Sequence, residues 1–332
     1  MAHPSGARPS DSHERPLLDL IRPQVRAQAR VLRERFLTAE PFRYLVVDDF
    51  VEPEYCRRLI AEFPAFDRKQ ALNELGQVGR KAVFQNLPEL GAAYRQFDRL
   101  LRSPEFLSLV SEITGIPHLL YDPDYIGGGT HENLSGQELD PHVDFNYHPK
   151  TKLHRRLNLI LFLNPEWREE WGGSLELHLN PWLPPAENRV KTVVPLANRC
   201  VLFETSEHSW HGFSRIERPA GSELSRRSIA VYFYTRERPP EETAPDHSTV
   251  YVQRPLPGHI TAGYTLREQD MESIHNLLER RDQQIRFLYE REKERQRKFT
   301  ETIEEIFRSP TFRLGSILTW PLRKLRDAIR GR

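Results

Sequence analysis

The chain has little cysteine and no long apolar run. Only Cys56 and Cys200 occur among its 332 residues, so the sequence excludes a disulfide framework or a cysteine-rich zinc module. So low a cysteine content is simplest to explain if the protein works in a reducing compartment. No apolar run approaches the ~20 residues that a membrane span needs, and residues 1–16 lack the apolar stretch of a secretory signal. We therefore expect a cytoplasmic protein.

Neither sign of charge dominates the composition. There are 48 basic and 47 acidic side chains, for a net charge of +1. This balance argues against a wholly basic nucleic-acid binder, so no nucleic-acid partner is expected. The charge is nevertheless uneven: residues 1–267 carry −2, residues 268–307 carry −3, and residues 308–332 carry +6. A neutral total thus hides an acidic body and a basic tail.

The order of apolar patterns predicts a helical first part and a strand-rich second part. Helical spacing of apolar residues marks 17–36, 92–102 and 104–114, and a strand at 42–50 is followed by a short helix. After Tyr121, Gly, Pro and Asn clusters separate short apolar runs, a pattern typical of a β-sandwich or barrel. These predicted strands are 156–164, 174–179, 191–195, 200–204 and 227–235.

The C-terminal part of the sequence is helical again. From residue 268, apolar residues recur at coiled-coil positions, although Arg281, Glu292 and Arg295 interrupt the seam. A short coiled coil and a solvated charged helix both fit. Residues 308–332 mix Trp, Leu and Ile with basic residues, which suits an amphipathic helix on an anionic membrane surface. A helix that docks on a protein partner is the alternative. If the tail does bind a membrane, the protein would be peripheral at the inner face of that membrane.

One short motif offers metal ligands. His142 and Asp144 are two apart, and in an extended segment both side chains point to the same side. His211 follows a later predicted strand and is the best candidate for a third ligand. Two histidines and one carboxylate are the ligand set of non-heme Fe(II) oxygenases, but three protein ligands also hold catalytic zinc. The ligand set alone therefore leaves the metal open.

A second motif offers a carboxylate-binding group. Arg226 and Ser228 share one face of the predicted strand 227–235, and a guanidinium with a hydroxyl suits a carboxylate. An organic acid held by a metal at one end and by arginine at the other is the arrangement of 2-oxoglutarate. Arg227 shares a face with apolar residues, so Arg226 is preferred, but a β-bulge would reverse the choice. Asn158, on a strand face with Ile160, and Tyr125 are further candidates for contact with the co-substrate.

Several segments in the same order resemble the 2-oxoglutarate/Fe(II)-dependent oxygenase superfamily, in its prolyl-4-hydroxylase-like branch. The resemblance implies a double-stranded β-helix, or jelly roll, buttressed by helices. It also implies Fe(II) on His142, Asp144 and His211, 2-oxoglutarate near Arg226 and Ser228, O2 as co-substrate, and ascorbate as reductant. The segments are GGGTH (127–131), DPHVDFNYHP (140–149), RRLNLILFLN (155–164), WGGSLELH (171–178), SWHGF (209–213) and RRSIAVYFYT (226–235), with YLVVDDFVEPEYC (44–56) as the usual entry.

These observations predict an α+β enzyme with a jelly-roll core and a C-terminal helical extension. The predicted activity is that of a 2-oxoglutarate-dependent dioxygenase. Related halogenases have no carboxylate at the position of Asp144, so the presence of this acid favours hydroxylation. Its substrate is a small molecule, a peptide such as a prolyl peptide, or a glycan, since 309–323 faintly resembles the ends of bacterial envelope-polysaccharide enzymes. A silent scaffold and a zinc hydrolase are the alternatives. The predicted parts are a disordered start and helix (1–37), a dioxygenase domain (38–240), a linker (241–267), a charged helix or coiled coil (268–307) and a basic tail (308–332).

Overall fold

The computed structural model describes residues 16–66, 81–219, 221–222 and 224–330. Most of the predicted disordered start lies outside these residues. The chain divides into two compact units, residues 1–252 and residues 253–332.

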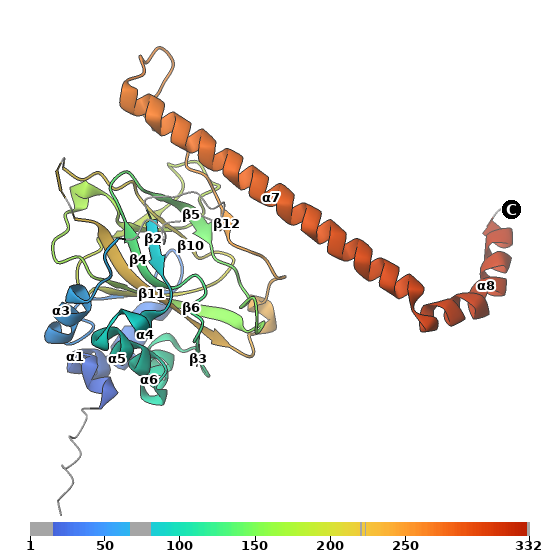
Figure 1. Cartoon of the computed structure of the whole chain (residues 1–332), viewed down its shortest axis with the longest axis horizontal. Coiled ribbons are helices and arrows are strands. Elements are labelled where there is room, and N and C mark those ends of the chain that lie inside the picture. The colour runs from blue at the N-terminus through green and yellow to red at the C-terminus, as the bar shows by residue number, and fades with distance from the viewer. Residues whose placement is uncertain (1–15, 67–80, 220, 223, 331–332) are drawn as a thin grey trace, which may run out of the picture. The chain divides into compact units, whose positions relative to one another are not determined.

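The first unit is built on two antiparallel sheets that form a jelly roll (Figure 1). The seven-stranded sheet runs β1-β9-β6-β11-β4-β2, with β3 paired to β11. The five-stranded sheet runs β12-β5-β10-β7-β8. The strands of the larger sheet are β1 (Tyr44–Val47), β2 (Lys81–Phe84), β3 (Leu120–Tyr121), β4 (Gly129–Asn133), β6 (His154–Phe162), β9 (Cys200–Glu204) and β11 (Arg226–Thr235). Those of the smaller sheet are β5 (Leu139–Val143), β7 (Leu175–His178), β8 (Val190–Val193), β10 (Trp210–Phe213) and β12 (Val250–Tyr251).

Helices from the first part of the chain cover the outer face of the larger sheet. Leu157, Leu159 and Leu161 of β6 are fully buried in one core with the apolar faces of these helices. The predicted long N-terminal helix is divided at Pro23, which begins a new helix because proline fits the first helical turn. The helical elements of this unit are η1 (Leu17–Leu20), α1 (Pro23–Ala27), α2 (Ala29–Leu37), α3 (Pro53–Ala61), α4 (Leu87–Leu90), α5 (Ala92–Leu101), α6 (Pro104–Thr114), η3 (Glu169–Trp171) and η4 (Pro240–Glu242).

The space between the two sheets holds a second, smaller core. Phe162 and Phe203 of the larger sheet are fully buried against Leu175 and Leu177 of the smaller one. This core occupies one part of the interior. Polar residues line the rest, described below as the candidate site.

The first unit extends beyond the predicted domain boundary at residue 240. Strand β12 pairs with β5, with Tyr251 opposite His142. Asn146 donates a hydrogen bond to the carbonyl of Pro245 (2.8 Å) and accepts one from the backbone amide of His247 (3.0 Å). Residues 241–252, which the proline- and glutamate-rich composition predicted to be linker, are therefore fixed to the strand that carries His142.

The second unit consists of two consecutive helices after an irregular segment. Helix α7 (Glu268–Arg308) begins with Arg267 as N-cap, where the Asp270 carboxylate accepts from the Arg267 amide (2.9 Å). It ends at Ser309, because Pro310 begins α8 (Pro310–Arg330). Pro321 lies inside α8. Among the described helices, none is both long and apolar enough to cross a membrane.

Candidate metal centre and anion site

The three predicted metal ligands lie together on neighbouring strands. His142 is near the end of β5, Asp144 follows it, and His211 lies on β10 directly opposite His142 in the antiparallel register. One ligand atom from each lies within 4.8 Å of the other two. Both histidines are buried, each with 6% of its surface exposed. Side chains two residues apart in an extended segment point to the same side, and β5 pairs with β10. Together these two features bring the three side chains to one point.

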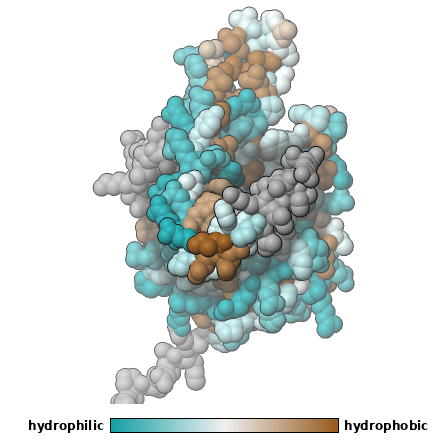
Figure 2. Space-filling model, turned by 90° about the vertical axis from the view of Figure 1, so that its right-hand side faces the viewer, coloured by the Kyte–Doolittle hydropathy of each residue, from teal (hydrophilic) through white to brown (hydrophobic). Residues whose placement is uncertain are grey.

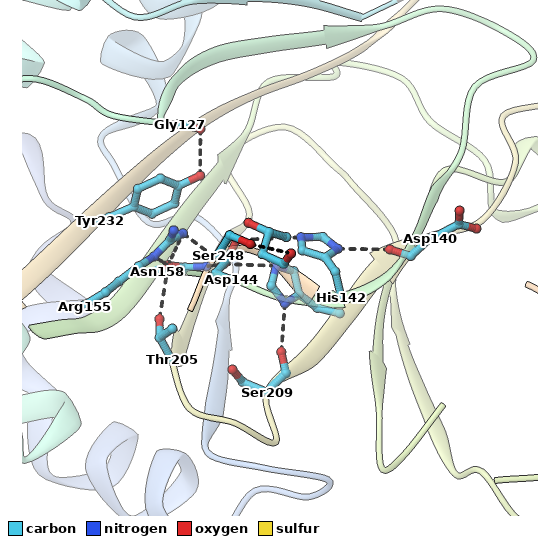
Figure 3. A network of polar contacts seen from close by, with 12 residues as sticks. Gly127, Asp140, His142, Asp144, Arg155, Asn158, Thr205, Ser209, Tyr232 and Ser248 are labelled. Carbon is cyan, nitrogen blue, oxygen red and sulfur yellow. Dashed lines mark hydrogen bonds and ion pairs between the residues drawn. The ribbon is translucent and has the colours of Figure 1, made fainter. Parts of the chain in front are cut away.

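The hydrogen bonds of the two imidazoles leave their other nitrogens for a metal. Nδ1 of His142 lies 3.0 Å from the carbonyl of Asp140, and Nδ1 of His211 lies 2.9 Å from the carbonyl of Ser209 (Figure 3). Because a carbonyl only accepts, each Nδ1 carries the proton and each Nε2 presents a lone pair. Burial lowers the pKa of His211, which favours the same neutral form. The donor set therefore fits a divalent transition metal.

Two neighbours hold the carboxylate of Asp144 in place. The Arg155 guanidinium donates to Oδ2 of Asp144 (2.9 Å), and the Asn158 amide donates to the same oxygen (2.8 Å). Asn158 in turn accepts from Arg155 through Oδ1 (2.9 Å). Burial raises the pKa of Asp144, but Arg155 and the two histidines outweigh burial and hold this pKa below its usual range. Asp144 is therefore ionised, as a metal ligand must be, and Asn158 contacts its carboxylate.

A β-bulge explains how Arg155 reaches the site. The register between β6 and β11 shifts between Phe233 and Tyr234, so Arg156 is the extra residue of β6. Arg155 therefore faces the same side as Asn158, although the two residues are three positions apart. Its guanidinium lies 3.5 Å from the centre of the Tyr232 ring and 4.5 Å from that of Phe145. Sequence reasoning missed Arg155 because regular alternation would place it on the opposite face.

A cavity of about 380 Å³ joins the three ligands to the predicted anion-binding residues. Arg226 and Ser228 line it from β11, and both are at least 96% buried. The Arg226 Nε donates to the carbonyl of Gly173 (2.6 Å). Gly173 has a positive φ of 69°, a conformation that favours glycine. Burial lowers the pKa of Arg226 to about 9.

Within the described part of the chain, Arg226 has no acidic partner, whereas Arg227 has one. Among the residues that the structure describes, no carboxylate forms an ion pair with Arg226. Arg227 instead pairs with Glu132 (3.1 Å) and does not line the cavity. The β11 register runs without a shift from Arg226 to Phe233, so no bulge exchanges the two side chains. Arg226 is therefore a buried cation suited to an anionic ligand.

Tyr125 differs from its predicted position. Its ring is buried, and its hydroxyl donates to Asp98 (3.1 Å), which also binds the Tyr121 hydroxyl. It does not line the cavity. The backbone explains this difference, because Tyr125 has a positive φ of 48° before the glycine run. Its side chain fixes the loop to helix α5 through Asp98.

Residues after the predicted domain end form another wall of the cavity. The Tyr251 ring stacks on the His142 imidazole, with centroids 5.1 Å apart and an angle of 30° between planes. Thr249 also lines the cavity. The run of β-branched and aromatic residues Thr249–Val252 was the available signal for a strand, but the surrounding prolines concealed it.

A second cluster of possible ligands lies on two loops. Asp122, Asp124 and His148 also offer ligand atoms within 4.8 Å of one another. Here, however, Nδ1 of His148 accepts from the backbone amides of Lys150 and Thr151 (3.3 and 3.1 Å). The Asp122 carboxylate likewise accepts from two backbone amides, and Asp124 pairs with Lys150.

Comparison with known proteins identifies the domain that contains the first cluster. The family model described as "2OG-Fe(II) oxygenase superfamily" matches residues 129–234. This range contains His142, Asp144, His211 and Arg226. Residues 129–234 belong to the 2OG-Fe(II) oxygenase superfamily. The predicted jelly roll and the predicted superfamily are confirmed.

The oxygenase domain is also similar to named prolyl hydroxylases. The chain is 26% identical over 266 residues to "Prolyl 3-hydroxylase OGFOD1" of Mus musculus, covering 72% of this chain and 41% of that protein. It is 32% identical over 121 residues to the Xenopus laevis protein of the same name, covering 32% of this chain and 23% of that protein. The chain thus spans less than half the length of these relatives. Among solved structures, a prolyl 4-hydroxylase from Phytophthora capsici aligns with a TM-score of 0.46 at 17% identity, covering 81% of this chain and 76% of that one.

Proposed function

We propose that this chain is an Fe(II)- and 2-oxoglutarate-dependent dioxygenase that hydroxylates a prolyl residue of a protein or peptide. The observation that carries the proposal is a single cavity with two ends of different chemistry. His142, Asp144 and His211 converge at one end, and Arg226, a buried cation without an acidic partner among the described residues, lies in the same cavity.

The residues of the chain have separate tasks in this activity. His142, Asp144 and His211 would hold the iron. Arg226, assisted by Ser228, would bind the distal carboxylate of 2-oxoglutarate, and this ion pair would compensate for the burial of the guanidinium. With iron, 2-oxoglutarate and O2 bound, oxidative decarboxylation to succinate and CO2 supplies the oxidising power to hydroxylate a C–H bond. Ascorbate would act only as an external reductant.

The walls of the cavity favour a compact apolar group as substrate. Phe145, Tyr232 and Tyr251 line it, and the Tyr232 hydroxyl donates a hydrogen bond to the carbonyl of Gly127 (2.8 Å). A prolyl ring suits a cavity with aromatic walls, since it is apolar and carries no donor of its own. The names of the relatives support the same class of substrate. A glycan would require more hydroxyl partners than these rings offer.

Succinate release and substrate mass test the proposal together. Iron-loaded protein should convert 2-oxoglutarate to succinate and add one oxygen atom to proline-containing peptides. Matched peptides with alanine in place of proline, together with glycans and nucleotide sugars, serve as the comparison panel. The variant His142→Ala is the negative control. Calorimetric binding of 2-oxoglutarate without succinate formation on any substrate would instead identify a catalytically silent binding protein, and oxidation of glycans alone would overturn the prolyl assignment.

A further inference from the structure

Helix α7 presents a seam of exposed residues at heptad spacing along most of its length. Leu278, Ile285, Leu288 and Phe299 have between 50% and 68% of their surface exposed. Apolar residues at a and d positions favour pairing with another helix. Figure 2 shows brown, apolar side chains among mostly hydrophilic ones on the face that it presents. The a positions are Met271, Leu278, Ile285, Glu292 and Phe299, and the d positions are Ile274, Arg281, Leu288, Arg295 and Thr302.

The charged residues of the seam restrict how a second copy of α7 can pair with it. In a parallel, in-register pair, each residue meets its own equivalent. Arg281 would then face Arg281, Glu292 would face Glu292, and Arg295 would face Arg295. Three layers of like charge at the centre of the interface oppose that arrangement.

An antiparallel pair reverses this effect, because a positions then face d positions. We propose that α7 forms an antiparallel coiled coil with α7 of a second copy, in the register that places Arg281 opposite Glu292 of the other copy. The two-fold axis passes between Arg286 and Phe287. This register creates two layers of opposite charge. It also places Ile285 against Leu288 in the central layers and Ile274 against Phe299 in the outer ones.

Other antiparallel registers match charge and apolar surface less well. A shift of one heptad that moves the axis toward the C-terminus places Arg281 against Phe299 and Glu292 against Leu288. A further heptad pairs Glu292 with Arg295, but it leaves Arg281 against Ile306 and fewer apolar layers. In the proposed register, Arg295 faces Leu278, where its ion pair with Glu292 of its own helix (2.6 Å) remains available. At the flanking positions near the axis no like charges meet, because Asp282 lies near Tyr289 and Gln284 near Arg291; only at the ends of the pair does Asp270 lie near Glu305.

Charge reversal separates this arrangement from every other one. By size-exclusion chromatography with light scattering, the full chain should show twice its 39.0 kDa mass. Arg281→Glu alone and Glu292→Arg alone should each give monomers, because each places two like-charge layers at the interface. The double variant Arg281→Glu/Glu292→Arg should restore the dimer. Arg286→Glu changes the same type of residue at an outward b position and should leave the dimer unchanged.

Distance measurement between spin labels tests the register directly. Cys56 and Cys200 are buried, so a label directed to Glu272→Cys reports that position selectively. In the proposed register the two labels lie 29 residues apart along the pair, or about 44 Å at 1.5 Å per residue. A parallel pair would place them about 10–20 Å apart, near the interaxial spacing.

Two results would overturn the proposal. One is a monomer at every concentration tested, and if that monomer sediments with vesicles of phosphatidylserine, the seam is a lipid-binding face. The other is a dimer that neither charge reversal weakens, because a parallel pair or an interface in the first unit would not respond to those changes.

Discussion

Two clusters of histidine and aspartate lie in the same domain, and they differ in what already occupies their ligand atoms. In His142, Asp144 and His211, the histidine Nδ1 atoms donate to carbonyls, and both Nε2 atoms converge on one carboxylate. In Asp122, Asp124 and His148, the histidine Nδ1 accepts from two backbone amides. Its Nε2 must then carry the proton, and it faces Asp122 at 3.4 Å. The first cluster therefore has the free donor atoms that a cation needs, whereas the second fastens two loops to each other.

The comparison is tested most strongly by removing one histidine from each cluster. His142→Ala should reduce succinate formation by more than about 100-fold, because loss of a direct ligand exceeds the effect of losing a ligand's hydrogen-bond partner. It should also abolish the rise in Tm that Mn(II) with 2-oxoglutarate gives the wild type. His148→Ala should keep both properties and lower the free energy of unfolding by about 1–3 kcal/mol, since two amides and Asp122 lose their partner. Equal loss of metal binding in both variants would contradict the distinction.

The adjacent arginines Arg226 and Arg227 allow the same comparison for an anion. Arg226→Met should raise the KM for 2-oxoglutarate by about 100-fold, the equivalent of ~3 kcal/mol of charge-assisted hydrogen bonding. Stability without ligand should not fall, because the substitution removes a buried cation that no carboxylate of the described residues neutralises. Arg227→Met should leave KM unchanged and lower stability by about 1–2 kcal/mol, because buried Glu132 loses a partly exposed partner. Steady-state kinetics and urea unfolding measure both values, and a larger KM effect at Arg227 would reverse the assignment.

Support of the ligand carboxylate should have a smaller effect. Arg155→Ala removes the cation that holds Asp144 and should weaken Mn(II) binding by about 10–100-fold. Asn158→Ala, which removes a neutral donor to the same oxygen, should weaken it less. Calorimetry with Mn(II) in the absence of oxygen gives these affinities without turnover. Metal affinity unchanged in Arg155→Ala would show that the site does not depend on this ion pair.

The smallest expected effect is at the stacked ring of Tyr251. Tyr251→Leu keeps apolar volume against His142 but removes the aromatic face, which should change metal affinity by about 1 kcal/mol or less. A change in peptide KM larger than the change in metal affinity would indicate that Tyr251 contacts substrate. If neither parameter changes, the stack has no role beyond packing.

The parts of the site that were predictable depend on local regularity. His142 and Asp144 were predictable because two residues of an extended segment share a side, and Arg226 because β11 keeps an unbroken register. Arg155 was not, since its direction depends on a single extra residue in β6. Tyr251 was not, because proline and glutamate around a two-residue strand resemble a linker. Tyr125 was misplaced because its positive φ breaks the strand pattern. The helical faces and the buried strands of the jelly roll, by contrast, follow directly from apolar periodicity.

The pairing of β12 with β5 also bears on how the domain can be isolated. Without Val250 and Tyr251, strand β5, which carries His142, would be an edge strand of its sheet and would expose unpaired amides and carbonyls. Such an exposed edge strand can pair with strands of other chains. A fragment trimmed to the matched range 129–234, or ended at the predicted boundary of 240, would therefore tend to self-associate through β5. A fragment that ends after Val252 keeps β12 paired with β5, so residue 252 is the earliest C-terminal end that suits a fragment for crystallisation.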